Sequence, residues 1–383
     1  MERGCVQCGE CLNVCPVFME FMREEYSPKA KRLLLEPVAA DCSPMPWRQV
    51  AALSRVCAGC DRCRQACARK LSTAELLADM RAKHPHWTQA LWEIWIRRLG
   101  PLWPTIGRIA TMMPDGITPA MLRASIESAK ALVNIKNIQP WAVVRRNPAS
   151  TPDHSRVVVF AGCTAHNARP QWRSKAEMLL GAFGHTVLDG SGFTCCGGTL
   201  RHAGQYAAMN EARRHNHNYW ETLGAPRIVA LCASCFHGLE DYAGTFLKDD
   251  AAVAWKNSLT PLSVVLHDAI SEITVHKPAI YGYHAPCHWG SADPDMPFLA
   301  KILPGLHKGA GICCGMGGIL KMSNPDISAH MARRCLSGLA DCGAVALTGC
   351  SGCVLQLAAA GKSGGSRAPA VHHWLDVLAV WGG

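Results

Sequence analysis

Two short stretches, FTCCGG at residues 193–198 and GICCGMGG at 311–318, each set adjacent cysteines before glycines. One cysteine precedes each pair, by 31 residues in the first stretch and 25 in the second, and a C-x2-C motif follows each after 35 residues. Five cysteines repeated in the same order indicate a duplication. The first set is Cys163, Cys195, Cys196, Cys232 and Cys235, and the second is Cys287, Cys313, Cys314, Cys350 and Cys353.

The segments around these cysteines alternate between strand and helix patterns. The apolar runs VVVF (157–160), IVAL (228–231) and AVAL (344–347) end close to a cysteine, as short buried strands would. Helical patterns lie between them, at residues 171–184 and 202–216. This alternation predicts α/β units with parallel sheets. Their cysteines should gather beyond the carboxyl ends of the strands, where such sheets bind ligands.

Adjacent cysteines are poorly suited to the commoner uses of thiols. Neighbouring Cα atoms are about 3.8 Å apart, below the usual disulfide range of ~4.4–6.8 Å. Five thiolates also exceed the four ligands of tetrahedral zinc. A larger iron–sulfur assembly uses them better, and the glycines let the backbone approach it closely. A zinc-stabilised binding module is kept as an alternative.

The N-terminus carries two runs of four cysteines with the spacing C-x2-C-x2-C-x3-C. Three closely spaced thiolates hold three corners of a cubane cluster, and in two-cluster ferredoxins the fourth cysteine binds the other cluster. Structural zinc usually has two pairs of ligands instead. We therefore predict two [4Fe–4S] clusters, one on Cys5, Cys8, Cys11 and Cys67, and the other on Cys15, Cys57, Cys60 and Cys63.

The 41 residues between these runs include a helix pattern bounded by Pro28 and Pro37. An insert of that length resembles the α-helical ferredoxin modules of respiratory enzymes.

The composition limits which cellular locations and kinds of partner are expected for this chain. The chain has 383 residues, 21 cysteines, 18% charged residues and a formal charge of +10. No apolar run reaches the ~18 residues of a membrane span, and Cys5 leaves no room for a signal peptide before it, so we expect reduced intracellular thiols. The charge suits an acidic partner or an anionic membrane face. The sequence has no Lys/Arg-rich run interleaved with aromatic residues, so it does not indicate a nucleic-acid partner.

Nucleotide-binding motifs are also missing. No G-x-G-x-x-G follows a strand pattern, and Gln356 stands where a P-loop ending at Gly361–Ser363 would need its first glycine. We therefore expect no flavin or NAD on this chain.

A tryptophan-rich stretch at residues 86–113 separates the two cysteine-rich parts. Trp87, Leu91, Ile94, Trp95 and Leu99 would share one helical face beside several arginines. Such a face predicts a membrane surface or a hydrophobic partner, with an ordinary core helix as the alternative. Residues 145–156, with two prolines and few apolar residues, are predicted to be a linker.

Some residues have weaker interpretations. Cys42, Cys335 and Cys342 are predicted to be buried structural thiols. His166, His237 and His288 flank cluster cysteines, so they are candidate proton donors for disulfide reduction, with packing roles as the alternative.

The pattern C…CCG…C-x2-C resembles the cysteine-rich CCG domain of heterodisulfide reductases. The fused ferredoxin module resembles the D-type subunit of those enzymes. It also resembles iron–sulfur subunits of sulfate-reducer transmembrane redox complexes and of glycolate, lactate and glycerol-3-phosphate dehydrogenases. The resemblance implies that each five-cysteine set holds a noncubane [4Fe–4S] cluster. Because some dehydrogenase-linked relatives lack cysteines of these sets, two full sets favour the heterodisulfide reductase type.

These observations predict an α+β multidomain chain with four parts. They are a helical ferredoxin domain (1–84), a Trp-rich segment with linker (85–155), and two CCG domains (156–275 and 276–383).

The expected function is electron transfer in a respiratory oxidoreductase at the cytoplasmic face of the inner membrane. Its partners would be a cytochrome b-type or quinone-reactive subunit, other redox subunits and a thiol/disulfide couple. The alternative is the iron–sulfur subunit of a flavin-dependent 2-hydroxyacid or glycerol-3-phosphate dehydrogenase.

Overall fold

The computed structural model describes residues 4–85, 87–113, 120–146, 154–275, 280–290, 292–363 and 368–380. Its centre is two four-stranded sheets in which every pair of neighbouring strands is parallel. The first has the order β3 (Thr186–Leu188), β2 (Arg156–Phe160), β4 (Arg227–Ala230), β5 (Leu259–Pro261). The second has the order β10 (Ala370–His373), β9 (Val345–Thr348), β7 (Tyr281–Tyr283), β8 (Leu306–Lys308). The two predicted α/β units with parallel sheets are therefore confirmed.

Helices connect the strands of each sheet, and apolar runs supply its core. Val157, Val158, Val159 and Phe160 of β2 are fully buried, because helices cover both faces of a parallel sheet. The helices of the first half are α9 (Gly162–Ala168), α10 (Pro170–Ala182), α11 (Gly198–His202), α12 (Tyr206–Thr222), α13 (Ala233–Glu240), α14 (Tyr242–Thr245), α15 (Asp249–Ser258) and α16 (Leu262–His267). Those of the second are η3 (Cys287–Trp289), α17 (Asp295–Ile302), α18 (Leu320–Ser323), α19 (Pro325–Ala340), α20 (Ser351–Ser363) and η4 (Trp374–Val377).

The single helix predicted at residues 202–216 is instead divided between α11 and α12. Gly204 lies between them with φ +77°, and a Cβ there would come within 2.6 Å of the Ala82 backbone nitrogen. The turn therefore lets an N-terminal helix approach the backbone closely, which a continuous helix would prevent.

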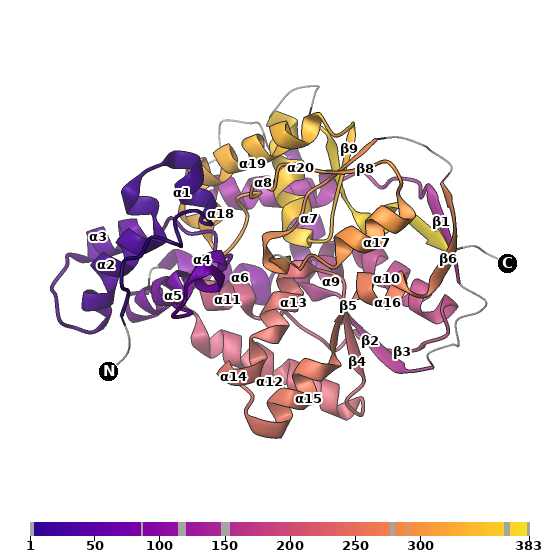
Figure 1. The fold of residues 1–383 in the computed structure, drawn as a ribbon, viewed down its shortest axis with the longest axis horizontal. Coiled ribbons are helices and arrows are strands. Elements are labelled where there is room, and N and C mark those ends of the chain that lie inside the picture. The colour runs from indigo at the N-terminus through magenta and orange to yellow at the C-terminus, as the bar shows by residue number, and fades with distance from the viewer. Residues whose placement is uncertain are drawn as a thin grey trace.

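The N-terminal region forms a separate group of short helices against both halves, drawn in indigo in Figure 1. Its elements are α1 (Pro16–Phe21), η1 (Glu24–Tyr26), α2 (Pro28–Ala39), α3 (Trp47–Ser54), α4 (Arg62–Ala66) and α5 (Thr73–Lys83). Helix α2 begins at Pro28 as predicted, after the Ser27 side chain caps it, but it continues through Pro37 to Ala39. The predicted end was wrong, because Pro37 removes one backbone hydrogen bond and the helix continues past it, with the Ala40 N–H bonding the Glu36 carbonyl oxygen at 3.1 Å.

The Trp-rich stretch forms α6 (Trp87–Arg97), η2 (Gly100–Leu102) and α7 (Trp103–Met112), followed by α8 (Ala120–Asn134). Trp103 is buried and stacks on Trp95 with ring centroids 5.5 Å apart. Trp92 and Trp95 pack against Leu200 and Met209 of the first half. These tryptophans therefore face the interior.

The prediction that Ile94, Trp95 and Leu99 share one outward face is wrong. Ile94 is 41% exposed, whereas Trp95 and Leu99 pack against the core, so the three do not share one surface. The side chains of Trp87 and Leu91 lie outside the described residues. Within the described chain, no helix has the length and apolar character needed to cross a bilayer.

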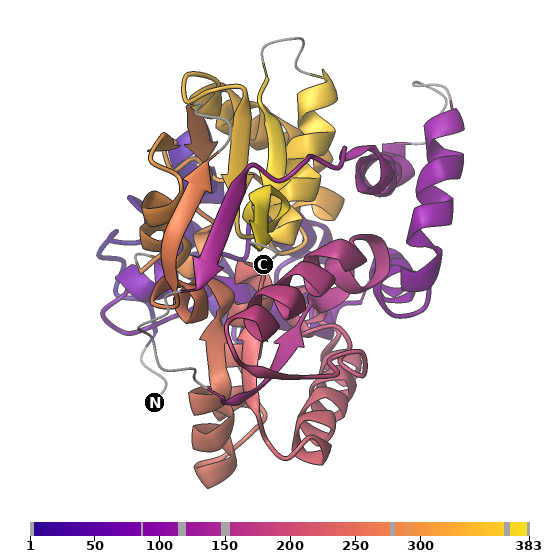
Figure 2. The same ribbon diagram turned by 90° about the vertical axis from the view of Figure 1, so that its right-hand side faces the viewer.

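A third sheet joins distant parts of the chain. In it, β1 (Ala142–Arg146) pairs antiparallel with β6 (Ile270–Val275) and parallel with β11 (Leu378–Val380). Figure 2 shows β1 between these strands. The linker predicted at residues 145–156 is wrong at both ends, because Arg145 and Arg146 belong to β1 and Arg156 begins β2. Residues 147–153, between them, lie outside the described part.

Candidate functional site

The first cysteine set gathers beyond the carboxyl ends of its strands, as predicted. Cys163 follows β2, Cys195 and Cys196 follow β3, and Cys232 and Cys235 follow β4. Glycines make room for the sulfurs. A Cβ at Gly162, which has φ +74°, would lie 2.4 Å from Cys235 Sγ, and one at Gly238 would lie 2.9 Å from Cys196 Sγ. Five converging thiols in a glycine-lined cradle fit an iron–sulfur cluster. That they bind one stays a prediction.

The second set repeats this arrangement in a more enclosed place. Cys287 follows β7, Cys313 and Cys314 follow β8, and Cys350 and Cys353 follow β9. All five are buried, whereas Cys163 and Cys195 of the first set are partly exposed. The sulfurs of Cys314 and Cys353 are 3.2 Å apart. This donor set fits the same kind of cluster.

Neighbouring sulfurs in these sets perturb one another. Contacts with Cys163 and Cys196 raise the pKa of Cys195, whereas contacts with Cys195 and Cys235 lower the pKa of Cys196. Contact with Cys232 raises the pKa of Cys350 to about 12. Several thiolates this close together repel one another unless cations lie between them. Bound metal ions would supply that positive charge.

The N-terminal cysteines fall into two groups. Cys67 lines one small cavity together with Cys5, Cys8 and Cys11, and the predicted exchange of fourth ligands stays a prediction. Cys63 borders the same cavity. Cys15 lies near Cys57, and desolvation raises the pKa of Cys15. Burial also raises the pKa of Cys63 to about 12. Both predicted cubane clusters stay predictions.

The second N-terminal run packs against the glycines that follow the second adjacent-cysteine pair. Desolvation, followed by repulsion from Cys313, raises the pKa of Cys60 well above its usual value. A Cβ at Gly317 would lie 2.2 Å from the Ala58 carbonyl oxygen, and one at Gly59 would lie 2.9 Å from Gly318 Cα. The glycines after CC thus let two backbones meet, and they bring the sulfur of Cys60 toward those of Cys287 and Cys313.

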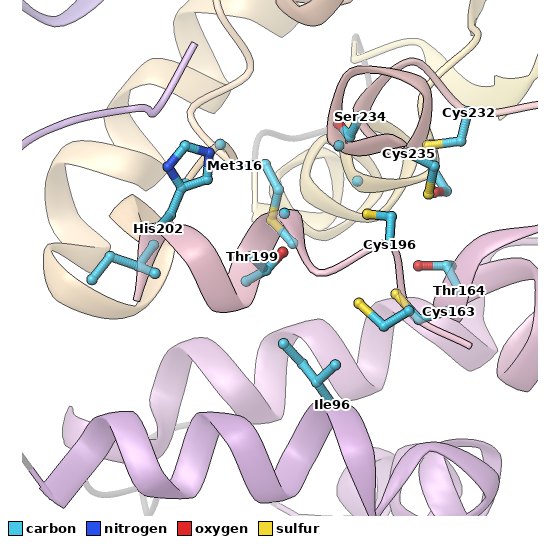
Figure 3. Close-up of a pocket in the computed structure, with 18 of the residues that line it drawn as sticks. Ile96, Cys163, Thr164, Cys196, Thr199, His202, Cys232, Ser234, Cys235 and Met316 are labelled. Atoms are coloured by element: carbon cyan, nitrogen blue, oxygen red, sulfur yellow. Dashed lines mark hydrogen bonds between the residues drawn. The ribbon is translucent and has the colours of Figure 1, made fainter. Parts of the chain in front are cut away.

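A cavity that is partly open to solvent lies between the two halves and the Trp-rich helices. All five cysteines of the first set line it, and none of the second set does. Figure 3 shows the sulfurs of Cys163, Cys196 and Cys235 turned toward this space, with Ile96 of α6 opposite. The second half contributes Met316, Ser351 and other residues to its wall.

The three predicted histidines have different surroundings. His237 and His288 both line the cavity, with ring centroids 5.0 Å apart. Desolvation lowers the pKa of His288 to about 4, so its imidazole is neutral. His166 is exposed and lines a different cavity, which it shares with Cys163 and Cys195. All three therefore lie close to the first set, and their proton-donor role stays a prediction.

Two further histidines were missed. His202 is buried at the wall of the main cavity, beside Gly59. A ring nitrogen of His284 lies within 4.8 Å of the sulfurs of Cys314 and Cys353, and its Nδ1 is 3.4 Å from Cys335 Sγ. His284 stands three residues before Cys287, and that spacing was an available signal. His202 becomes visible only when the halves are brought together.

The three cysteines outside the predicted cluster sets differ in burial. Cys335 is buried, as predicted, and burial raises its pKa. Cys342 is partly buried, and Cys42 is exposed, so the predicted burial of Cys42 is wrong. Its position in the turn after α2 explains this exposure.

Residues 157–240 and 281–358 each match the family model described as "Cysteine-rich domain" (CCG). The chain carries two CCG cysteine-rich domains. The two matches contain all ten cysteines of the duplicated sets, and each cysteine-rich domain contributes strands to one parallel sheet.

Similarity to curated proteins extends well beyond the cysteine-rich domains but is low. The chain is 24% identical to the glycolate oxidase iron-sulfur subunit of Escherichia coli (strain K12), over 98% of this chain and 93% of that protein. It is 23% identical to the D-type subunit of the dihydromethanophenazine:CoB–CoM heterodisulfide reductase of Methanosarcina acetivorans, over 86% of this chain and 81% of the relative. It is also 24% identical to the B-type subunit of the fumarate reductase (CoM/CoB) of Methanothermobacter marburgensis, over 87% of this chain and 62% of the relative.

Proposed function

We propose that this chain is the iron–sulfur electron-transfer subunit of an oxidoreductase complex. The observation that carries the proposal is the close approach of residues 58–59 to Gly317 and Gly318, because it places the cysteines of the second N-terminal run near those of the second set. Electrons would pass between the N-terminal clusters and the second set, and from there to the first set. The names of the relatives, each an iron–sulfur or reductase subunit, support the same role.

The first set is where we propose that a thiol/disulfide couple reacts. Its five cysteines line the cavity, so a small molecule or an extended peptide could reach them. Bound iron–sulfur clusters would supply the electrons. Cleavage of one disulfide takes two electrons and two protons and yields two thiols. Among this chain's own residues, His237 faces the same space and is the proposed proton donor, whereas the neutral His288 is suited to hydrogen bonding only.

A membrane partner with a quinone- or haem-bearing subunit is part of this proposal. Leu102, Ile109 and Met112, on η2 and α7, are 51%, 58% and 84% exposed. Arg108, on the same helix α7, is exposed as well. An apolar patch with a basic edge suits a hydrophobic partner subunit near an anionic membrane face.

A second candidate is the iron–sulfur subunit of a flavin-dependent 2-hydroxyacid dehydrogenase. The glycolate oxidase relative favours it, since that similarity covers 98% of this chain. In this case electrons would enter from a flavoprotein, and the cavity at the first set would serve a different acceptor.

Anaerobic purification with iron and zinc analysis tests the cofactors. Two cubane and two further four-iron clusters require about 16 iron atoms per chain. A content of about 8 iron atoms with two zinc ions would contradict clusters in the cysteine-rich domains and support the zinc-stabilised alternative.

Partner identification and a thiol assay separate the two redox candidates. A co-purifying cytochrome b-type protein supports the first, and a co-purifying flavoprotein supports the second. The chemically reduced protein, freed of reductant, should also convert 2-hydroxyethyl disulfide to thiol, and a Cys195→Ser control should not. Equal thiol yield from both would remove the first set from the reaction.

A further inference from the structure

We propose that Ser234 and Ser351 form a reciprocal bridge between the two cysteine sets. Each serine donates a hydrogen bond to a cysteine sulfur of the other half and so tunes the cluster of its partner domain. The inference rests on the proposed clusters at both sets. It adds hydrogen bonds through which residues of one half change the reduction potential of the cluster in the other half.

The contacts are short and run in both directions. Ser234 Oγ, in the first half, lies 3.1 Å from Cys350 Sγ in the second. Ser351 Oγ, in the second half, lies 3.0 Å from Cys232 Sγ in the first, and the Ser351 backbone nitrogen donates to the same sulfur at 3.4 Å. A backbone hydrogen bond of 2.9 Å from Ala233 to Gly349 holds the two segments side by side.

The two serines occupy different places in equivalent motifs. Ser234 is the third residue of CASC (232–235), whereas Ser351 is the second residue of CSGC (350–353). Each motif begins a helix, α13 or α20, and the two helix starts face each other across the domain boundary. A serine at a helix start commonly caps its own helix. At α13 no side chain makes that cap, and the Ser234 hydroxyl turns to the other domain instead.

The direction of each hydrogen bond follows from the state of the sulfur. A metal-bound cysteine is a thiolate with no proton, so the serine must donate. The Ser234 oxygen is then free to accept from His288 Nδ1, which lies 3.0 Å away. This gives the chain His288 to Ser234 to Cys350, and it assigns the proton of the neutral imidazole to Nδ1.

Hydrogen bonds to cluster sulfurs are among the factors that set reduction potential. A donor stabilises the extra negative charge of the reduced cluster and therefore raises its potential. Loss of the Ser234 hydroxyl should thus lower the potential of the second set, although Ser234 lies next to Cys235 of the first. Loss of the Ser351 hydroxyl should lower the potential of the first set, with the backbone donor of Ser351 retained.

Redox titrations followed by EPR test this crossed pattern. Signals are first assigned to each half by their loss in Cys195→Ser and Cys313→Ser. Ser234→Ala should shift the second-set signal to lower potential, Ser351→Ala should shift the first-set signal, and iron content should be unchanged. Ser234→Thr, which keeps a hydroxyl, should restore the second-set potential. Ser258→Ala, whose hydroxyl bonds the Trp255 carbonyl oxygen at 2.7 Å, is the matched control.

The possible results distinguish failure of the serine bridge from failure of the proposed function. Clusters present at both sets with unshifted potentials, or with each variant shifting only its own half, would overturn the bridge alone. Absence of iron from both sets in the unaltered chain would overturn the proposed function and the bridge together.

Discussion

The two cysteine-rich domains have the same five cysteines on the same type of parallel sheet, yet their surroundings are opposite. The second set is fully buried and lies against Cys60 of the N-terminal region. The first set lines the cavity and is partly exposed. A duplication therefore supplies two equal donor sets, and the surroundings of each set bury one and leave the other open to the cavity.

The largest expected effect comes from breaking the inner set. In Cys313→Ser, we expect electron transfer from the N-terminal clusters to the first set to slow by about 100-fold or more, equivalent to about 3 kcal/mol in barrier. Cys195→Ser should leave reduction of the second set unchanged. Freeze-quench EPR after rapid reduction measures both. Equal loss in the two variants would mean that the halves receive electrons independently.

A second expected effect concerns one residue before the first cysteine of each set. The first half has Gly162, at φ +74°, and the second has Pro286, at φ −63°. Gly162→Ala introduces a Cβ 2.4 Å from Cys235 Sγ and adds about 1–2 kcal/mol of backbone strain.

This variant should lose the iron of the first set, about four atoms, while Pro286→Ala keeps both sets. Iron analysis and the EPR signal of each half measure whether each variant keeps both clusters. An unchanged iron content in Gly162→Ala would show that the first set can accommodate a Cβ at position 162 despite its short distance to Cys235 Sγ.

A third expectation uses a buried carboxylate of the second half. Burial raises the pKa of Asp295 to about 7, and its carboxylate accepts from Trp289 Nε1 at 2.9 Å. Among the described side chains of residues 156–275, no carboxylate is buried. Between the usual carboxyl pKa and about 7, the folded chain binds a proton that the unfolded chain does not, so stability falls as pH rises.

From pH 6 to pH 8 this group should reduce the free energy of unfolding by roughly 1.4 kcal/mol. Thermal unfolding at the two pH values measures the change, and Asp295→Asn should flatten the dependence. An unchanged slope in that variant would assign the pH dependence to other groups.

The smallest expected effect makes the second half more like the first. His284 stands where the first half has Phe160, three residues before the first cysteine. Histidines that replace cysteines as ligands raise the potential of iron–sulfur centres, and a ring nitrogen of His284 lies within 4.8 Å of the Cys314 and Cys353 sulfurs. His284→Phe should therefore lower the second-set potential modestly and leave the first unchanged, as measured by redox titration. A shift of equal size in the first set would indicate a general structural change.

Much of this arrangement was predictable because local patterns encode it. Apolar runs that end near cysteines predicted β2, β4 and β9, and the repeated spacing predicted two sets of five thiols. The cysteine runs also predicted that Cys67 joins Cys5, Cys8 and Cys11. Each of these inferences depends on residues close together in sequence or on exact repetition.

The contacts between domains were not predictable in this way. The contacts of Ala58 with Gly317, of Ser234 with Cys350, and of His202 with Gly59 join residues more than 100 positions apart. Strand β1 was taken for part of a linker because its partners, β6 and β11, are remote and its last residues are arginines. Apolar aromatic residues of α6 suggested an outer surface, although they cover the cavity.

The third sheet has a consequence for how the chain folds. Ala142 of β1 pairs with Leu378 of β11, so this parallel pairing closes a loop of 236 residues (378 − 142) that contains both cysteine-rich domains. Closing such a long loop costs more entropy than any local pairing and is slow. We expect each domain to assemble around its own sheet first, and β11 to be added last, at the end of the molecule opposite the N-terminal helices (Figure 1). Until that final strand docks, β1 is paired with β6 alone among the described strands.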